Sequence, residues 1–195
     1  MSPPPGDKPG GAPRVFYLTP DHPAPSWGVG LLYEHVRLLR EVGFDARVLH
    51  QRRPFRVSWL ESEAPVEYLD DESFAPRGED VLVVPEVLAA EAAQRPWPGR
   101  RGVFVQGSFL ALRGHAAAIR YGDLGFDFAL AVLPHVAAVV ERHFGLGAAV
   151  VPPFVAPHAD LAADQLAAVS HLAGPARIIA PAGSGKTRVL TERLR

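Results

Sequence analysis

The sequence predicts an α/β protein built on an open parallel sheet with helices on both of its faces. Two observations lead to this prediction. Short runs of β-branched and aromatic residues alternate with helical stretches between Arg14 and Pro153, and this alternation is typical of sheets whose crossover connections are helices. A strand, a helix and a second strand also follow one another within residues 14–50, which is the length of a βαβ unit with a right-handed crossover.

The first βαβ unit begins with a predicted strand over residues 14–19, which ends before Pro20. After a loop over residues 21–28, apolar side chains recur at the spacing of one helix face, so we expect a helix over residues 29–42. These apolar residues are Val29, Leu32, Val36 and Leu39. Gly43 is well placed to end this helix, because glycine readily adopts the left-handed conformation that closes many helices.

The same alternation continues to residue 153. Strands are predicted at residues 44–50, 66–69, 80–85, 102–106, 128–133 and 148–151, and helices at residues 86–94 and 134–144. The run at residues 66–69 is short and lies within an acidic stretch, so a weak strand at an edge of the sheet is expected there. The order of these elements predicts a Rossmann-like sheet.

Residues 61–80 are unusually acidic. They carry eight carboxylates against one base, Arg77. Charge runs are usually solvated, so a solvated loop around the edge strand is the preferred interpretation. A site for a basic substrate is the alternative.

Composition excludes several classes of protein. Of the 195 residues 48% are hydrophobic, which suffices for a core, and 20 Lys+Arg against 21 Asp+Glu give a net charge of -1, so no general affinity for nucleic acid or membrane surfaces is expected. The absence of cysteine excludes disulfides and thiolate metal sites. Residues 1–13 are dominated by proline and glycine, and we expect a disordered lead there, with no signal peptide, no membrane span and a cytoplasmic location.

Composition shifts after Pro157, and we place a domain boundary near His158. A helix is predicted over residues 161–172 and a short strand over residues 176–180. The run Ala180-Pro-Ala-Gly-Ser-Gly-Lys-Thr187 then precedes a helical stretch over residues 188–195. This is the strand, loop and helix context of a Walker A phosphate-binding loop, in which backbone N–H groups surround phosphate oxygens.

In such a loop, Lys186 would contact the β- and γ-phosphates of ATP, and the Thr187 hydroxyl would coordinate Mg²⁺. The segment from residue 159 to residue 195 resembles the N-terminal opening of UvrD/Rep-type superfamily 1 DNA helicases, which accept alanine at the position of Ala180. The resemblance implies that Gln165 reads adenine and that Arg188 lies beside the phosphates. The candidate ATP-binding residues are Gln165, Ala182, Gly183, Ser184, Gly185, Lys186, Thr187 and Arg188. An ordinary flexible Gly/Ser turn is the alternative, and DNA binding is expected only of a complete helicase.

Residues 14–157 resemble the N-terminal Rossmann-like domain of GT-B glycosyltransferases of the retaining, GT4-like kind. The resemblance rests on the first strand, on the turn Ser26-Trp-Gly-Val-Gly30 with the helix after it, and on residues 128–153. It implies an acceptor cleft formed by residues 20–30, 106–109 and 134–135, with Gly28 and Gly30 close to the diphosphate of a nucleotide-sugar donor. Where this family often has a histidine or aspartate, the chain has Gln106. The donor-binding domain of the family has no counterpart here.

The sequence therefore predicts a composite of two incomplete pieces, a sugar-acceptor domain and an ATP-binding loop, without catalytic turnover in either. A non-catalytic binding module with a vestigial P-loop is the alternative. NADP binding at Gly28 and Gly30 with Arg52 and Arg53 is a weaker interpretation, since the third glycine of the dinucleotide fingerprint would fall at Tyr33. The eight histidines show no metal-binding spacing. Self-association or fraying is expected at the C-terminal segment.

Overall fold

The computed structural model describes residues 12–113 and 119–153. Of Phe109 and Arg113 it describes the backbone alone. The chain divides into two units, Met1–Pro152 and Pro153–Arg195, and the fold described here is that of the first. Most of the predicted lead, the boundary near His158 and every predicted element between residues 159 and 195 lie outside the described residues, so they stay predictions.

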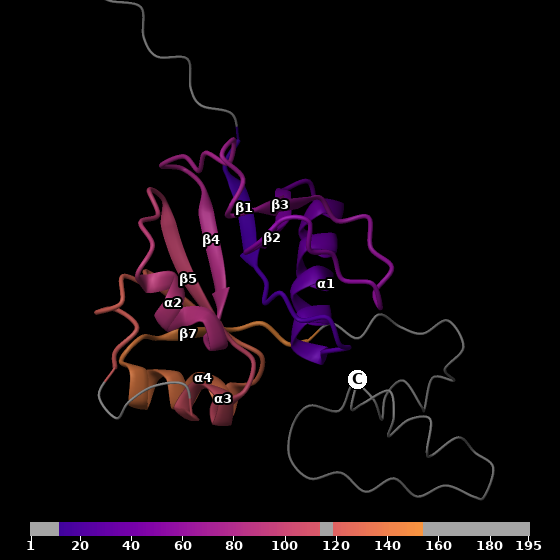
Figure 1. The fold of residues 1–195 in the computed structure, drawn as a ribbon. Coiled ribbons are helices and arrows are strands. Elements are labelled where there is room, and N and C mark those ends of the chain that lie inside the picture. Colours follow the sequence, from indigo (N-terminus) through magenta and orange to yellow (C-terminus); the bar gives the residue numbers. More distant parts are fainter. Residues whose placement is uncertain (1–11, 114–118, 154–195) are drawn as a thin grey trace, which may run out of the picture. The chain divides into compact units, whose positions relative to one another are not determined.

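A seven-stranded sheet forms the centre of the described fold (Figure 1). Every pair of neighbouring strands is parallel, and the strand order is β3-β2-β1-β4-β5-β6-β7. The strands are β1 Arg14–Leu18, β2 Asp45–His50, β3 Val66–Tyr68, β4 Val81–Pro85, β5 Arg100–Val105, β6 Phe128–Ala131 and β7 Ala148–Val150. The predicted open parallel sheet is confirmed, and β3 lies at an edge as expected.

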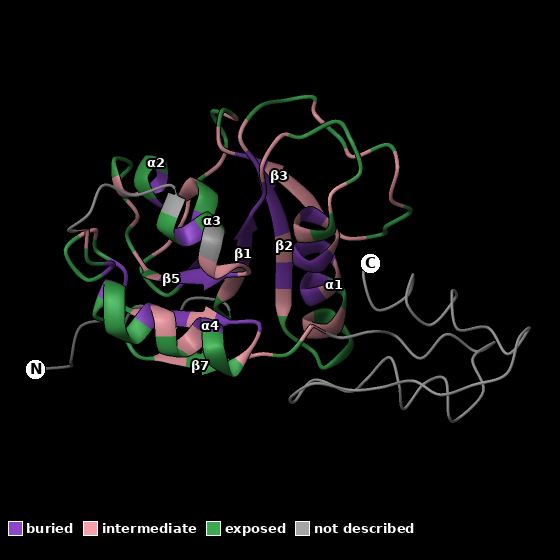
Figure 2. Ribbon diagram, turned by 90° about the horizontal axis from the view of Figure 1, so that it is seen from below, coloured by how far each residue is buried: buried purple, intermediate pink, exposed green. Residues whose placement is uncertain are grey.

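Helices cover both faces of the sheet. The long helix α1, Trp27–Glu41, packs on one face, where its His35 contacts Tyr17 of β1 and Phe104 of β5. In Figure 2, α2 and α3 lie on the other side of the strands from α1. The shorter helical segments are η1 Glu86–Leu88, α2 Ala89–Ala93, α3 Ser108–Arg113, α4 Pro134–Val139 and η2 Val140–Phe144. This arrangement confirms the prediction of a two-sided α/β fold.

Helix α1 is defined by a cap at each end. It begins at Trp27, earlier than predicted, because Ser26 adopts an extended backbone conformation and its hydroxyl accepts a hydrogen bond from the Val29 N–H at 3.5 Å. At the other end Gly43 has a φ of +94°. The N–H of Phe44 donates to Leu39 O at 2.9 Å and that of Gly43 to Arg40 O at 3.0 Å, which is the Schellman pattern of helix closure. The predicted role of Gly43 is confirmed.

Two predicted helices are interrupted, and one helix was not predicted. The helix expected over residues 86–94 is a 3₁₀ turn followed by the short α2, and the one expected over residues 134–144 widens into the π-helical turn η2 before Gly145. The unpredicted helix is α3. Its six residues, Ser108–Arg113, are too few for a repeating apolar face to be recognised.

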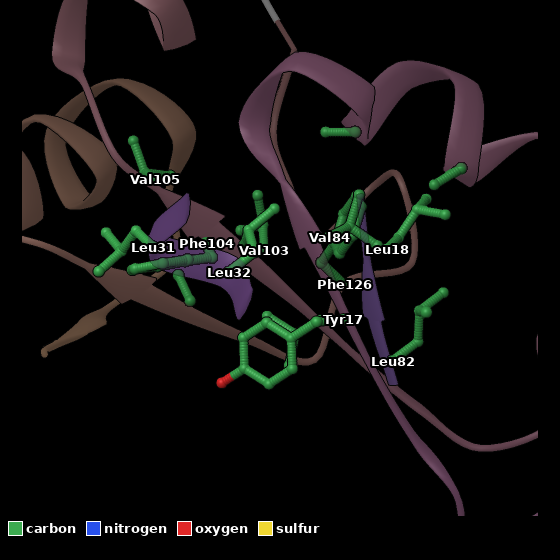
Figure 3. Packing of buried hydrophobic residues seen from close by; sticks show 14 of the residues in the cluster. Tyr17, Leu18, Leu31, Leu32, Leu82, Val84, Val103, Phe104, Val105 and Phe126 are labelled. Carbon is green, nitrogen blue, oxygen red and sulfur yellow. The ribbon is translucent and has the colours of Figure 1, made fainter. Parts of the chain in front are cut away.

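The core lies on both faces of the central strands. Figure 3 shows Leu31, Leu32, Tyr17 and Phe104 packed on the α1 side of the sheet. Val84, Val103 and Val105 point to the opposite face and are fully buried as well. Strands buried on both faces read as continuous apolar runs, which is why β4 and β5 could be recognised from their sequences.

The interpretation of residues 61–80 as a solvated stretch is wrong for Asp80, which has an exposed fraction of 0%. Its carboxylate accepts hydrogen bonds from the backbone N–H of Arg14 at 3.1 Å and of Arg77 at 2.7 Å, and it forms an ion pair with the Arg14 guanidinium at 2.5 Å. Burial alone would raise the pKa of Asp80, but these donors outweigh it and lower the pKa. Asp80 therefore ties the start of β1 to the start of β4.

Candidate functional site at the carboxyl ends of the strands

The strand order creates a switch point between β1 and β4. The chain moves from β1 toward β3 in one direction and from β4 toward β7 in the other, so the crossovers on either side diverge and leave a crevice beyond the carboxyl ends of the strands. A cavity of about 230 Å³ lies there, and it is called the switch-point cavity below. Its lining residues are Pro20, Ser26, Trp27, Gly28, Val29, Leu32, Pro85, Glu86, Val87, Gln106 and Leu110.

This cavity brings together two of the three segments predicted to form an acceptor cleft. Pro20 and Ser26–Val29 come from the first segment, and Gln106 comes from the second. Pro134 and His135 do not line the cavity. The carboxyl ends of β1, β4 and β5 therefore form the candidate site without the start of α4.

Gly28 packs closely against Gln106. The Nε2 of Gln106 donates to the carbonyl oxygen of Gly28 at 3.2 Å, and a Cβ atom on Gly28 would overlap the Gln106 side-chain oxygen. A side chain at residue 28 would therefore require the Gln106 side chain to move away from the first turn of α1. Sequence reasoning selected this residue for close approach to a ligand, whereas its close neighbour in the structure is a side chain of the same chain.

Gly30 and Gly28 line different hollows of the α/β unit. Gly30 lines an open hollow of about 620 Å³ beside α1, together with Tyr33, Arg37 and the loop around Glu61. A Cβ atom on Gly30 would lie 4.0 Å from the Trp59 ring, which is ordinary contact. Because the two glycines face different hollows, the donor-diphosphate site assigned to them stays a prediction without geometric support.

Glu86 forms the floor of the switch-point cavity, and sequence reasoning had treated it only as the first residue of a helix. Its exposed fraction is 2%. The Oε1 atom accepts hydrogen bonds from the backbone N–H groups of Gln106 at 3.1 Å and of Gly107 at 2.9 Å. Burial raises the pKa of Glu86, and the backbone N–H groups of Gln106, Gly107 and Glu86 itself oppose this rise only in part. The available sequence signal was an acidic residue directly after a buried strand.

The rim of the same cavity is apolar. Trp27, Val87 and Leu110 are exposed by 43%, 52% and 46% respectively, and all three line the cavity. They come from α1, η1 and α3. Large apolar side chains gathered around a concave polar floor are typical of small-molecule sites. We call these three residues the apolar rim.

The first turn of α1 adds donors to the cavity. Trp27 and Gly28 are its first two residues, and within the described ranges neither backbone N–H has a hydrogen-bond acceptor. Unpaired N–H groups at a helix start carry a partial positive charge. The cavity therefore offers both hydrogen-bond donors and a carboxylate acceptor.

A second polar cluster lies at the carboxyl ends of β1 and β2. His50 Nδ1 lies 2.8 Å from Asp21 Oδ1, and His50 Nε2 lies 2.8 Å from the Tyr33 hydroxyl. An ionised carboxylate only accepts, so Nδ1 carries the proton and Nε2 accepts from Tyr33. Burial lowers the pKa of His50 against the opposing effect of Asp21, and burial raises the pKa of Tyr33 to about 12. A neutral histidine at the end of β2 thus links Asp21, in the loop after β1, to Tyr33 of α1.

The polar groups near this cluster are already paired, which disfavours the NADP interpretation. The backbone N–H groups of Gln51 and Arg52 donate to the Asp21 carboxylate, and the Arg53 guanidinium is paired with Asp71. Arg53 is therefore already neutralised where a 2′-phosphate would need a cation.

The described residues hold no group of three or more histidine, cysteine, aspartate or glutamate side chains that could bind a metal ion. None of their helices is long and apolar enough to cross a membrane. The candidate ATP-binding residues, Gln165 and residues 182–188, lie outside the described ranges. Their donor set suits Mg-ATP, because it combines a cation, a hydroxyl group and a glycine-rich backbone.

Comparison with known proteins bears on the C-terminal segment. No curated protein matches the chain, and the glycosyltransferase resemblance of residues 14–157 receives no support from the family match. Residues 161–195 match the family model of the UvrD/REP helicase N-terminal domain, so the resemblance of this segment to the helicases is confirmed.

Proposed function

We propose that the chain binds two small molecules in separate units. Residues 180–188 bind ATP with Mg²⁺, and the switch-point cavity of the α/β unit binds the ligand that a glycosyltransferase would use as its acceptor. Two independent observations support the two parts, a family match for the first and a cavity for the second.

The ATP-binding part is supported by the match of residues 161–195 to the UvrD/REP helicase N-terminal domain. Lys186 contacts the terminal phosphates, Thr187 offers its hydroxyl oxygen to Mg²⁺, and the Gly183 and Gly185 amides surround the phosphate oxygens. Gln165 and Arg188 hold the adenine and the phosphates. When bound, Mg²⁺ neutralises charge on the phosphate oxygens. The same match suggests DNA as a further partner.

Titration of the full chain with Mg-ATP tests this part. We expect Lys186→Ala to weaken binding by about tenfold or more, because a phosphate contact of the Walker lysine is lost. Arg193→Ala removes a cation from the same segment but not from the motif, and it should leave the affinity nearly unchanged. Equal losses in both variants would indicate non-specific attraction of the nucleotide. Repeating the titration with single-stranded DNA present tests whether the two ligands are coupled.

The acceptor part is supported by the position of the switch-point cavity. It lies where open α/β sheets bind their ligands, it has a polar floor in Glu86 and Gln106, and its rim is apolar. Glycosyl transfer to the bound molecule is the finer form of this proposal, and it rests on the resemblance of residues 14–157 to GT-B enzymes.

A fragment screen on the ¹⁵N-labelled full chain tests the acceptor part. Binding fragments should shift the amide signals of Trp27, Val87 and Leu110 and leave that of His135 unchanged. Leu110→Trp should fill the cavity and abolish these shifts. Leu112→Trp is the matched control, because Leu112 is 48% exposed on the same helix and does not line the cavity. Shifts that persist in Leu110→Trp would refute this location.

A further inference from the structure

The switch-point cavity contains one charged side chain among its lining residues, Glu86. No arginine, lysine or histidine belongs to the described lining. A phosphate or carboxylate ligand would therefore meet a carboxylate without a side-chain cation to balance it, which disfavours anions. An anionic ligand is therefore disfavoured in this cavity.

Glu86 has one carboxylate oxygen available to a ligand. Its Oε1 is already shared by two backbone N–H groups, those of Gln106 and Gly107. Its Oε2 receives no hydrogen bond from another described residue, and the remaining backbone donor to this carboxylate is the N–H of Glu86 itself. The residue as a whole is buried, with an exposed fraction of 2%, and it lines the cavity. A carboxylate oxygen has more than one lone pair, so Oε2 is suited to accept from a donor on a ligand.

The first turn of α1 supplies the complementary polar group. The Trp27 and Gly28 N–H groups have no acceptor within the described ranges, and both residues line the cavity beside Glu86. A hydroxyl group can donate to a carboxylate and accept from an N–H at the same time, whereas an ammonium group can only donate. An alcohol can therefore use both features at once, which a group that only accepts cannot.

The rest of the lining limits the number of polar groups on the ligand. Proline, valine and leucine side chains together with the apolar rim of Trp27, Val87 and Leu110 make up most of it. A sugar carries hydroxyl groups on every side, and several of them would be buried without partners here. An apolar body with a single hydroxyl group leaves none unpaired.

We propose that the switch-point cavity binds an alcohol with an apolar body, whose hydroxyl group donates to Glu86 Oε2 while the apolar rim holds the body. This inference rests on the proposed acceptor site and names the chemical class of its ligand. Glu86 is then a specificity-determining residue, because it requires a donor on the ligand and repels anions.

Three aromatic compounds of similar shape test the proposal on the full chain at about pH 8, a value on the alkaline side because burial raises the pKa of Glu86. Benzyl alcohol can donate a hydrogen bond, benzyl methyl ether can only accept, and benzoate is an anion. We expect the ether and benzoate each to bind about tenfold more weakly than the alcohol, because the ether leaves a carboxylate oxygen unpaired and benzoate brings a second negative charge beside it.

Glu86→Gln separates the donor requirement from shape. The amide oxygen can keep the bonds to Gln106 and Gly107, and an NH₂ group then replaces Oε2, so the ether should gain on the alcohol until the two bind equally. Glu141→Gln, an exposed glutamate on η2, should keep the wild-type preference. If Glu86→Gln does not fold, the comparison of the ligands on the wild-type protein still tests the proposal.

Each outcome has a distinct meaning. Ether or benzoate binding at least as tightly as the alcohol overturns the inference, as does a preference unchanged in a folded Glu86→Gln protein. Both results would leave the proposed acceptor site in place, because the fragments would still shift the signals of the apolar rim. Absence of any shift at the rim would instead remove the proposed site itself.

Discussion

Asp80 illustrates how a single side chain can organise the start of a parallel sheet. It accepts from the backbone N–H of Arg14 and of Arg77 and pairs with the Arg14 guanidinium, while its own carbonyl oxygen accepts from the Arg100 N–H at 3.1 Å. Strands β1, β4 and β5 therefore begin in a common hydrogen-bonded group. Buried charges of this kind are stable only while every partner is present.

We predict that Asp80→Asn destabilises the α/β unit by about 3 kcal/mol at neutral pH, because the Arg14 charge loses its buried partner. The pKa of Asp80 is lowered from its ordinary 3.8, so its contribution is fully present above pH 3.8 and is lost as the pH falls through the lower, folded-state pKa. Urea titrations of both proteins at several pH values measure this. Glu79→Gln, at the exposed neighbour, should change little, and a gap between wild type and Asp80→Asn that persists in strong acid would contradict the assignment.

His35 makes a second residue-level prediction. It lies between the Tyr17 and Phe104 rings, with centroids at 5.7 and 4.8 Å. Burial lowers its pKa from 6.5, and Glu34 opposes this only weakly. As the pH falls below 6.5, His35 binds a proton in the unfolded chain but not yet in the folded chain. The free energy of unfolding therefore decreases until the pH reaches the folded-state pKa of His35.

His35→Phe should therefore flatten the loss of stability between about pH 7 and pH 5 while keeping the ring contacts. Thermal melts across this range provide the measurement. His143→Phe, at an exposed position on η2, should retain the wild-type slope. If His35→Phe melts with an unchanged slope, another group must be responsible.

At the scale of elements, α1 shows how far sequence patterns reach. Its apolar face and its end at Gly43 could be predicted, because a repeating period and a left-handed glycine are local signals. Its start was placed too late, since Trp27 and Gly28 have weak helix preferences and only the Ser26 cap makes them helical. The short helix α3 had no such signal.

The closing glycine of α1 allows a direct test. Gly43→Ala should destabilise the unit by about 1 kcal/mol, because a side chain at a φ of +94° is strained although no atom lies within 4 Å of the added Cβ. Gly78→Ala is the matched control, as it also has open space but no positive φ. Chemical denaturation of both variants decides the matter, and equal stabilities would show that α1 closes in another way.

The candidate site was only partly accessible to sequence reasoning for a related reason. Gln106 and the Ser26–Gly30 turn were identified, because they follow predicted strands. Glu86 was missed, since its carboxylate and the N–H groups of Gln106 and Gly107 that donate to it meet only when β4 and β5 pair. The split of Gly28 and Gly30 between two hollows follows from the 100° turn per residue of a helix, which places positions two apart on opposite sides.

For the whole molecule, alternation of strands and helices sufficed to predict the sheet but not the order of its strands. That order depends on the direction of each crossover, which no local pattern encodes. The order found, with β1 beside β4, generates the switch-point cavity. The location of the site is therefore a property of the topology.

We predict that residues 1–153 fold alone, because Met1–Pro152 form a compact unit and the described part of the chain has a buried core on both faces of its sheet. The shortened chain should keep the far-ultraviolet circular dichroism spectrum of an α/β protein. Its melting temperature should lie within a few degrees of that of the α/β unit in the full chain. Loss of cooperative melting on removing residues 154–195 would mean that the two units are one folding unit.

The strand order also bears on synthesis by the ribosome. The first two strands to emerge, β1 and β2, become interior neighbours, and each later strand joins an outer edge of what has already formed: β3 beside β2, then β4 beside β1, and β5 to β7 in turn. No strand has to be inserted between two that are already paired. A growing chain can therefore add to its sheet in the order in which its residues leave the exit tunnel, without undoing earlier pairings.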